Sequence, residues 1–392
     1  MGRRAFRIGA LGLYAFVLFF QPPLTPVSQV YITGAVTLLL LAMEHGTGDI
    51  ETIVGRSRMN YVLVALVVMS AYLLMVSLVD LLFIEESNVT VNRFRCFNQL
   101  FVLTIIQMAG ILYILVKANV WKLSLDDVLL VALIAGALQA LCCLAAYFSP
   151  QVRALFLTFA DDIYRNPWQY ERRGFGFSST LLDTFGYGIG MLCGILLARP
   201  LRSKLANLVA FALLVFVALQ NSRTGLVVIA LVFAIWLVAR RDGVSGVLLV
   251  AAVALLAFYA FRLIPEIVGC MNRSDSVTIR WVGSALNDFY LMVTGQIELS
   301  DVQFVDDIAP LSSVPFEVIF GSGHSIYDTS QELGFRSDIG YLNVVWIYGV
   351  IGTLLYYGFV VYLGAVAFNS QSERRYRVLA ISVLAAFFLV QF

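Results

Sequence analysis

Apolar runs long enough to cross a lipid bilayer recur along almost the whole chain. A helix that spans the hydrocarbon needs about 20 predominantly apolar residues, and about eleven runs approach that length. They lie at roughly 6–20, 29–43, 61–83, 96–116, 127–148, 179–198, 203–220, 224–239, 244–263, 338–367 and 376–392. The runs do not show the alternating pattern typical of β-strands. The sequence therefore predicts an all-α, polytopic integral membrane protein, with its 392 residues in a single transmembrane domain.

The composition agrees with this class and excludes several others. Charged residues make up 13% of the chain, whereas soluble domains carry roughly 25%. The formal net charge of +1 provides no global field to attract a polyanion. These values exclude a soluble enzyme, a disordered scaffold and a nucleic-acid-binding protein. The five cysteines show no C-x-x-C spacing and there are two histidines, so we expect no disulfide framework, no metal and no cofactor.

The distribution of basic residues predicts an orientation, because lysine and arginine concentrate in cytoplasmic loops. With a cytoplasmic N-terminus and runs that alternate in direction, Lys117, Lys122 and Lys204 all fall on the cytoplasmic side. No small-residue cleavage site follows the first run, so we expect a retained helix rather than a signal peptide. The opposite face has two long loops, 149–178 and 264–337. Long loops are usually functional, and we expect the site on that face.

Two segments on that face place arginines beside small residues. Arg172 and Arg173 precede Gly174 in the first long loop, and Asp183 follows about one turn inside the next run. An acid at that depth is costly unless it is paired or faces a cavity. Arg223 lies in a link that is too short to leave the membrane surface. Because arginine binds phosphate through two parallel hydrogen bonds, both segments are candidate phosphate sites. A structural ion pair and a snorkelling anchor are the alternatives.

The second long loop adds three further candidates. Apolar residues at helical spacing over 279–293 predict a helix on the membrane surface with Arg280 on its polar side. The segment Gly321-Ser322-Gly323-His324 places a possible acid–base group in a glycine-rich loop. The segment Arg336-Ser337-Asp338 opens the run 338–367, and Tyr341 follows. Helix capping by the aspartate and a solvated face around the arginine are the structural alternatives.

Several arginines on the far face of a membrane, without a metal motif, suit a lipid-linked pyrophosphate. A sugar joined to a lipid pyrophosphate is already activated, because the departing group is a stable polyanion. The enzyme must then stabilise the leaving charge and help an acceptor hydroxyl lose its proton. The sequence therefore predicts glycosyl transfer from a lipid-linked donor.

The order of these motifs resembles that of the bacterial O-antigen polymerases of the Wzy type and of the related O-antigen ligases. The resemblance covers roughly residues 150–370 and rests on Arg172-Arg173-Gly174, Ser222-Arg223-Thr224-Gly225, Arg280-Trp281, Gly321-Ser322-Gly323 and Ser337-Asp338-Ile339-Gly340-Tyr341-Leu342. It implies a metal-independent, inverting glycosyltransferase of the GT-C type. Such an enzyme polymerises undecaprenyl-diphosphate-linked repeat units at the periplasmic face of the bacterial inner membrane. A chain-length regulator and a flippase are the further partners that the resemblance implies.

The resemblance also suggests roles for particular residues. Arg173, Arg223 and Arg280 would hold the diphosphate of the donor. Asp338 would orient the acceptor hydroxyl, with His324 as the alternative base. The remaining residues expected to contact substrate are Arg172, Asp183, Arg336 and Tyr341.

Two alternatives to a polymerase stay open. The ligases, which transfer the finished glycan to lipid A-core, carry a histidine-containing H-N motif where this chain has Ser337-Asp338. That difference favours a polymerase over a ligase. A transporter of lipid or polysaccharide is the second alternative. Transporters usually show inverted repeats with broken helices near the bilayer midplane, and the two halves of this sequence show no matching pattern.

Overall fold

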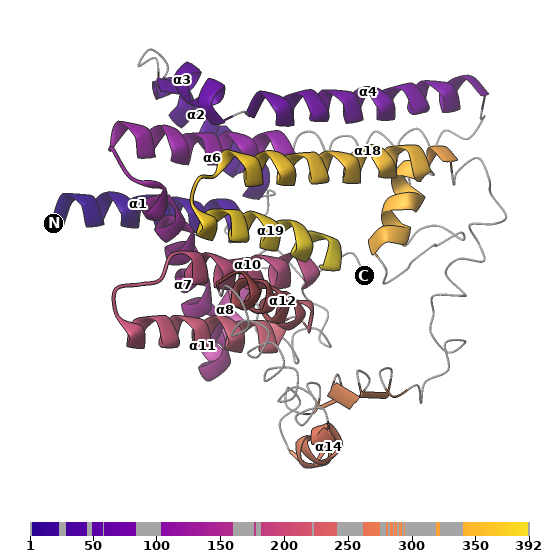
Figure 1. Cartoon of the computed structure of the whole chain (residues 1–392). Helices are drawn as coiled ribbons and strands as arrows, with labels where there is room; N and C mark the ends of the chain where they lie inside the picture. The colour runs from indigo at the N-terminus through magenta and orange to yellow at the C-terminus, as the bar shows by residue number, and fades with distance from the viewer. Residues whose placement is uncertain are drawn as a thin grey trace. The chain divides into compact units, whose positions relative to one another are not determined.

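A computed structural model gives the fold of the chain (Figure 1). It describes residues 2–22, 29–44, 49–57, 59–83, 103–159, 176–177, 182–221, 223–240, 262–274, 319–321 and 340–390, together with single positions between 280 and 294. Regular secondary structure in these ranges is helical and contains no strand. The predicted all-α class is therefore confirmed for the described part of the chain.

The helices follow the predicted apolar runs. In chain order they are α1 (Gly2–Phe20), α2 (Gln29–Glu44), α3 (Asp49–Ser57), α4 (Met59–Phe83), α6 (Leu103–Val120), α7 (Leu125–Phe148), α8 (Pro150–Phe159), α10 (Leu182–Ala198), α11 (Lys204–Asn221), α12 (Arg223–Arg240), α14 (Ile264–Asn272), α18 (Gly340–Ser370) and α19 (Arg374–Val390). All predicted runs except 244–263 coincide with one of these helices, and that run lies almost entirely outside the described residues. Three short helices, α3, α8 and α14, lie between the predicted runs.

Two helices are long and apolar enough to cross a membrane, judged by length and composition. They are α7 and the part of α18 that covers Val344–Ser370. The other apolar helices in the described ranges have 10–17 residues by the same criterion. Large apolar side chains are exposed on several of them, such as Leu39, Leu208 and Leu354, which is unfavourable in water. These features point to membrane association, and the number of spans stays a prediction.

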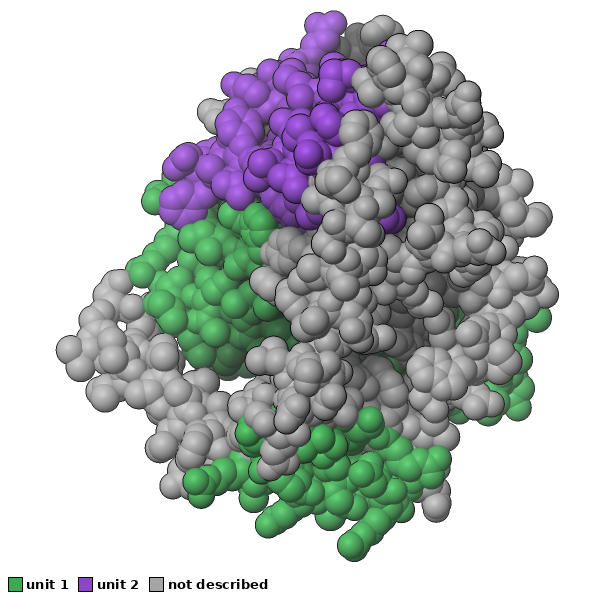
Figure 2. Space-filling model, turned by 90° about the vertical axis from the view of Figure 1, so that its right-hand side faces the viewer, with its two compact units in different colours: residues 1–33, 120–297, 371–390 green, residues 34–119, 298–370, 391–392 purple. Residues whose placement is uncertain are grey.

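The chain divides into two compact units (Figure 2). Unit 1 comprises residues 1–33, 120–297 and 371–390, and unit 2 comprises residues 34–119, 298–370 and 391–392. Each unit combines segments that are far apart in the sequence, because helices from the start, middle and end of the chain pack together. A single transmembrane domain over residues 1–392 stays a prediction.

A stripe of small residues on α10 sets the packing in unit 1. Gly186, Gly190 and Gly194 recur every four residues, and the spacing predicts close contact with a neighbouring helix. In the structure a Cβ on Gly190 would collide with Val228 of α12, and a Cβ on Gly194 would lie 3.0 Å from Val232 Cγ1. The predicted close packing is confirmed. The core beside this contact joins α10, α12 and α19 through Met191, Val228, Val232 and Ala386.

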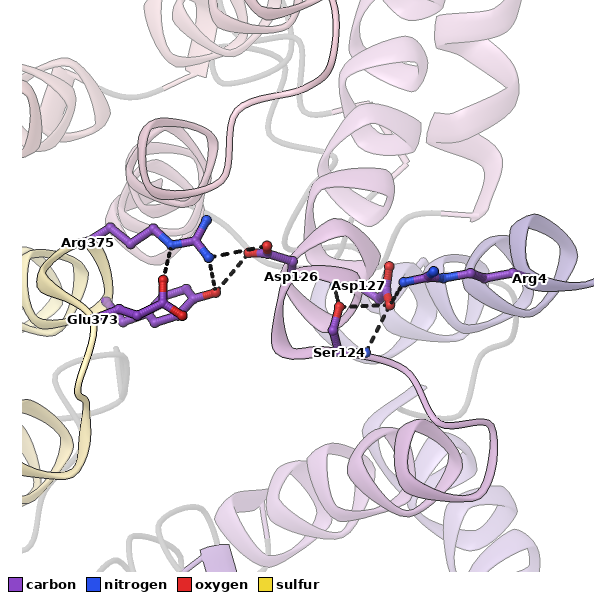
Figure 3. Close-up of polar contacts among 7 residues, drawn as sticks. Arg4, Ser124, Asp126, Asp127, Glu373 and Arg375 are labelled. Carbon is purple, nitrogen blue, oxygen red and sulfur yellow. Dashed lines mark hydrogen bonds and ion pairs between the residues drawn. The ribbon is translucent and has the colours of Figure 1, made fainter. Parts of the chain in front are cut away.

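The starts of α1, α7 and α19 meet at one end of unit 1, which we call the Arg4 end (Figure 3). Ser124 caps α7 in a capping box with Asp127, whose carboxylate also pairs with Arg4. Arg375 pairs with Asp126 at 3.3 Å and donates to Glu373 at 2.7 Å. The hydrogen bond to Glu373 raises the pKa of the Arg375 guanidinium, and the charge of Asp126 acts in the same direction. Charged pairs therefore join helix ends from the start, middle and end of the chain.

Two backbones cross at glycines in unit 2. Gly321 and Gly349 both have positive φ, at 87° and 69°, and α18 is broken at Gly349. A Cβ on either glycine would collide with backbone atoms beside the other. The hydroxyl of Tyr72 in α4 lies 3.2 Å from the carbonyl oxygen of Phe320 and 2.9 Å from that of Tyr348, so it can donate to either. One tyrosine thus links α4 to both sides of the crossing.

Candidate functional site

The structure describes the predicted site residues to different extents. Five of them lie outside the described residues: Arg172, Arg173, His324, Arg336 and Asp338. For three more, Asp183, Arg223 and Tyr341, the backbone is described but not the side chain. Arg280 is described in full, and its side chain is exposed on a helical residue.

The backbone positions of Asp183 and Arg223 refine the prediction. The described part of α10 begins at Leu182, so Asp183 is the second described residue of this helix, and its predicted depth of about one turn stays a prediction. Arg223 opens α12 two residues after Asn221 ends α11. The predicted shortness of this link is confirmed, and its position at the membrane surface stays a prediction.

The segment that follows Arg172 and Arg173 is anchored on the last turns of α7. Gly176 has φ +64°, and a Cβ there would lie 2.8 Å from the backbone nitrogen of Cys143. The backbone of Phe177 donates a hydrogen bond to the thiol of Cys142. The ring of Phe177 stacks on Phe156 of α8 with centroids 4.9 Å apart. Backbone and ring contacts therefore hold the end of the first long loop against α7 and α8.

The corner between α11 and α12 also contacts the last turns of α7, at Cys143. Asn221 is fully buried, and its Nδ2 donates to the carbonyl oxygen of Val217 at 2.9 Å and lies 4.0 Å from Cys143 Sγ. Gln139, one turn before Cys143, is also fully buried, with its Nε2 3.8 Å from the same sulfur. We call this end of unit 1, formed by the last turns of α7, residues 176–177 and the α11–α12 corner, the Cys143 end. Buried polar groups among apolar helices are expensive and often mark functional positions.

The start of α10 belongs to the same end. A Cβ on Gly225 would lie 3.1 Å from the Cα of Gly186, so the first turns of α10 and α12 are in contact. Residues 176–177, the start of α12 and the described start of α10 are therefore brought together in unit 1, whereas Arg173 itself lies outside the described residues.

Arg280 lies in a helical segment whose described contacts are with α14 rather than with the Cys143 end. The described residues between 280 and 291 are helical, as the apolar spacing predicts, with Arg280 and Ser284 exposed and Leu286 and Tyr290 half-buried. A Cβ on Gly283 would lie 3.0 Å from Met271 Cβ, so this segment packs on α14. No contact among the described residues joins it to Cys143. The convergence of all three arginines on one cavity stays a prediction.

The other predicted residues belong to unit 2. Tyr341 lies in the first turn of α18, eight residues before the break at Gly349. Gly321, which opens the predicted Gly321-Ser322-Gly323-His324 segment, is the partner of Gly349 in the backbone crossing. Among the predicted site residues that the structure describes, Asp183, Arg223 and Arg280 belong to unit 1 and Tyr341 belongs to unit 2.

Two parts of this arrangement were not recognised from the sequence. The break at Gly349 falls inside a run that the sequence predicts as one helix, and a glycine in an apolar run is a weak signal on its own. Tyr72 gives no sequence signal, because its role depends on two carbonyl groups far along the chain. Gln139 could have been found, since it is the only amide or charged residue in the run 127–148 after Asp127, and such a residue in the middle of an apolar run is unusual.

Within the described ranges, no group of three or more histidine, cysteine or acidic side chains is placed to hold a metal ion. Comparison of the chain with models of protein families, with curated proteins and with solved structures finds no match.

Proposed function

We propose that the chain is a membrane glycosyltransferase that polymerises undecaprenyl-diphosphate-linked oligosaccharide repeat units into O-antigen or a related surface polysaccharide. In this proposal about eleven spans form a GT-C-like protein of the bacterial inner membrane, with the working face in the periplasm. Transfer is inverting and needs no metal ion, because arginines rather than a metal neutralise the leaving diphosphate.

The observation that carries the proposal is the meeting of two arginine-bearing segments at the Cys143 end. Gly176 and Asn221 both contact Cys143. Arg173 lies three residues before Gly176, and three residues span at most about 11 Å. Arg223 lies two residues after Asn221. Both arginines therefore lie within three residues, along the sequence, of a described residue that contacts Cys143. A pair of arginines suits a diphosphate, which offers oxygens to more than one guanidinium group.

Purified protein in lipid nanodiscs, supplied with a lipid-linked repeat unit, tests the reaction directly. A polymerase extends the repeat unit into a ladder of glycans on a gel, whereas a ligase transfers one preformed chain to lipid A-core. We expect Arg173→Ala and Arg223→Ala to lower the rate roughly 100- to 1000-fold, as loss of one contact to a developing anion does. Arg173→Lys and Arg223→Lys are expected to be severely impaired as well, because lysine lacks the two-pronged geometry.

Arg3→Ala is the matched control, because Arg3 is an exposed arginine at the first turn of α1. It is expected to leave the ladder unchanged. A normal ladder from Arg173→Ala, Arg223→Ala and Arg280→Ala would rule out the arginine clamp.

The acid–base assignment needs its own comparison. Asp338→Asn and His324→Ala are compared between pH 6 and pH 9 in the same assay. We expect Asp338→Asn to be the slower variant, because proton loss from the hydroxyl is late in a dissociative transfer and positioning dominates. A wild-type rate for Asp338→Asn with an inactive His324→Ala would make the histidine the base.

A transporter is the second candidate, and the break in α18 favours it. Broken helices line substrate sites in many transporters, because backbone groups freed from the helix lie at the cavity. α18 contains a break at Gly349. Vesicles loaded with a labelled lipid-linked oligosaccharide distinguish the two functions. Movement of label across the bilayer without any increase in glycan length would identify a transporter.

A further inference from the structure

The Arg4 end of unit 1 is strongly basic. The turn between α10 and α11 lies beside it, because Leu201 of this turn lines the same cavity as Leu130 and Ile134 of α7. Together the Arg4 end and this turn carry ten described arginines and lysines: Arg3, Arg4, Arg7, Lys122, Arg199, Arg202, Lys204, Arg374, Arg375 and Arg377. The described acids there are Asp126, Asp127 and Glu373, and each pairs with Arg4 or Arg375. Positive charge therefore remains in large excess.

The turn between α10 and α11 presents two of these cations in a fixed conformation. Asn207 accepts a hydrogen bond from the Leu201 backbone at 2.7 Å and donates to the carbonyl oxygens of Leu201 and Ser203 at 2.9 and 3.0 Å. Arg202 and Lys204 are exposed on this turn and form no ion pair with any residue that the structure describes. The turn is a rigid, doubly cationic corner.

An apolar cavity of about 160 Å³ lies directly beside this corner, between α7, α10 and α11. Leu201 from the turn is one of its walls, opposite Leu130 and Ile134 of α7. Several lining residues are only half-buried, so the cavity opens to the surface. The first turns of α11 beside it expose Leu205 and Leu208, at 70% and 65%.

Two adjacent cations above an apolar cavity match a molecule with an anionic head and a hydrocarbon tail. We propose that the α10–α11 turn and the cavity below it bind an anionic phospholipid, with its phosphate at Arg202 and Lys204 and an acyl chain in the cavity. A soluble polyanion would leave the cavity and Leu205 uncovered. Arg7, which lies over the ring of Trp121 at 5.5 Å, gives the same end the arginine and tryptophan typical of a membrane interface. The proposal depends on membrane location but not on glycosyl transfer.

The test measures phospholipid retention by detergent-purified protein. Protein is mixed with phosphatidylglycerol, with phosphatidylcholine or with glycerol 3-phosphate, and bound lipid is counted by native mass spectrometry alongside the melting temperature. We expect phosphatidylglycerol to be retained and to raise the melting temperature, since a ligand of the folded state stabilises it. Each cation near an anionic surface strengthens binding about fivefold, so Arg202→Gln/Lys204→Gln should weaken retention roughly 25-fold.

Arg262→Gln/Arg273→Gln is the matched control, because it removes two exposed charges that flank α14. Ala210→Phe fills the cavity and leaves the turn intact, and it should also lower retention. Equal retention of phosphatidylglycerol by the Arg202→Gln/Lys204→Gln variant and the wild type would overturn the proposal. The proposal would also be overturned if glycerol 3-phosphate, which has no acyl chain, or phosphatidylcholine, which has no net charge, were retained as well as phosphatidylglycerol and raised the melting temperature as much. A protein recovered without detergent would refute membrane location itself, and none of these outcomes depends on a glycan substrate.

Discussion

Gly321 and Gly349 adopt backbone conformations that residues with a side chain rarely adopt. Their backbones also approach each other too closely to leave room for a Cβ atom on either residue. Both have positive φ, and Gly349, at φ 69° and ψ 175°, lies in a region that is open essentially to glycine alone. Since each would direct a Cβ into the backbone beside the other, the crossing needs both glycines. These two residues set the break in α18.

Replacement of Gly349 by alanine should destabilise unit 2. The backbone strain contributes about 1–3 kcal/mol, and the collision with the segment around Gly321 adds to it. Gly358→Ala is the control, because Gly358 lies in the same helix with no atom within 4 Å of its would-be Cβ. That variant should be neutral or slightly stabilising. Thermal unfolding in detergent compares the two, and equal melting temperatures would show that the crossing is not tight.

Tyr72→Phe should loosen the same crossing without changing packing volume. The hydroxyl lies within hydrogen-bond distance of two carbonyl groups, and its removal should lower stability by about 0.5–1.5 kcal/mol. Hydrogen exchange of peptides that contain residues 319–321 and 345–350 is expected to quicken. Tyr61→Phe is the control, since Tyr61 is 41% exposed and its described contact is between its ring and Tyr362. Unchanged exchange in Tyr72→Phe would mean that the hydroxyl does not hold the crossing.

At the scale of elements, the contact between α10 and α12 connects packing to the candidate site. The glycine stripe lets α12 approach α10 closely. Arg223 opens α12, and Asp183 is the second described residue of α10. A change in their separation would therefore move both segments.

Gly190→Ala should destabilise this helix pair by about 1–3 kcal/mol, the usual effect of overpacking. Val228→Ala removes Cγ1, the nearer of the two Val228 atoms that the new Cβ would meet, and keeps Cβ. The double variant should therefore recover part of the loss. A double-mutant cycle on melting data measures this coupling, which is typically 0.5–3 kcal/mol for residues in contact. Gly188→Ala, in the same helix with open space around it, is the control. Additive effects of Gly190→Ala and Val228→Ala would contradict the close contact.

At the scale of the whole molecule, the predicted orientation places the two ends of unit 1 on opposite sides of the membrane. The Arg4 end combines cations that the sequence assigns to cytoplasmic loops, and α7 connects it to the Cys143 end. The second long loop, with α14, is assigned to the periplasmic side.

Cysteine labelling tests this orientation. Cys270 is exposed on α14, whereas Cys142 is half-buried and Cys143 and Cys193 are buried. We expect Cys142 and Cys143, within α7, not to react. In a Cys96→Ser background, a membrane-impermeant maleimide should label Cys270 from the periplasm of intact cells. Ser372→Cys, introduced together with Cys270→Ser in that background, is the matched probe of the Arg4 end, because Ser372 is exposed beside α19. It should react only after lysis. The reverse pattern would invert the topology and move the proposed site to the cytoplasm.

The sequence by itself determined the helices and the small-residue stripe of this protein. Apolar runs, turn residues and four-residue spacing are local properties, and backbone hydrogen bonding within a helix is local as well. The predicted runs therefore coincide with helices to within a few residues at most ends. The stripe at Gly186, Gly190 and Gly194 likewise predicts close packing, because glycines have no side chain that would keep a neighbouring helix at a distance.

Only the tertiary structure decided which segments meet. Cys143 contacts Gly176 and Asn221, and Gly349 crosses Gly321, although these partners are separated by long stretches of chain. No local pattern selects such partners, because the contact depends on how distant helices share buried surface. For the same reason the sequence predicts α18 as one continuous apolar helix. Its break at Gly349 depends on contact with the backbone around Gly321, which lies outside the helix.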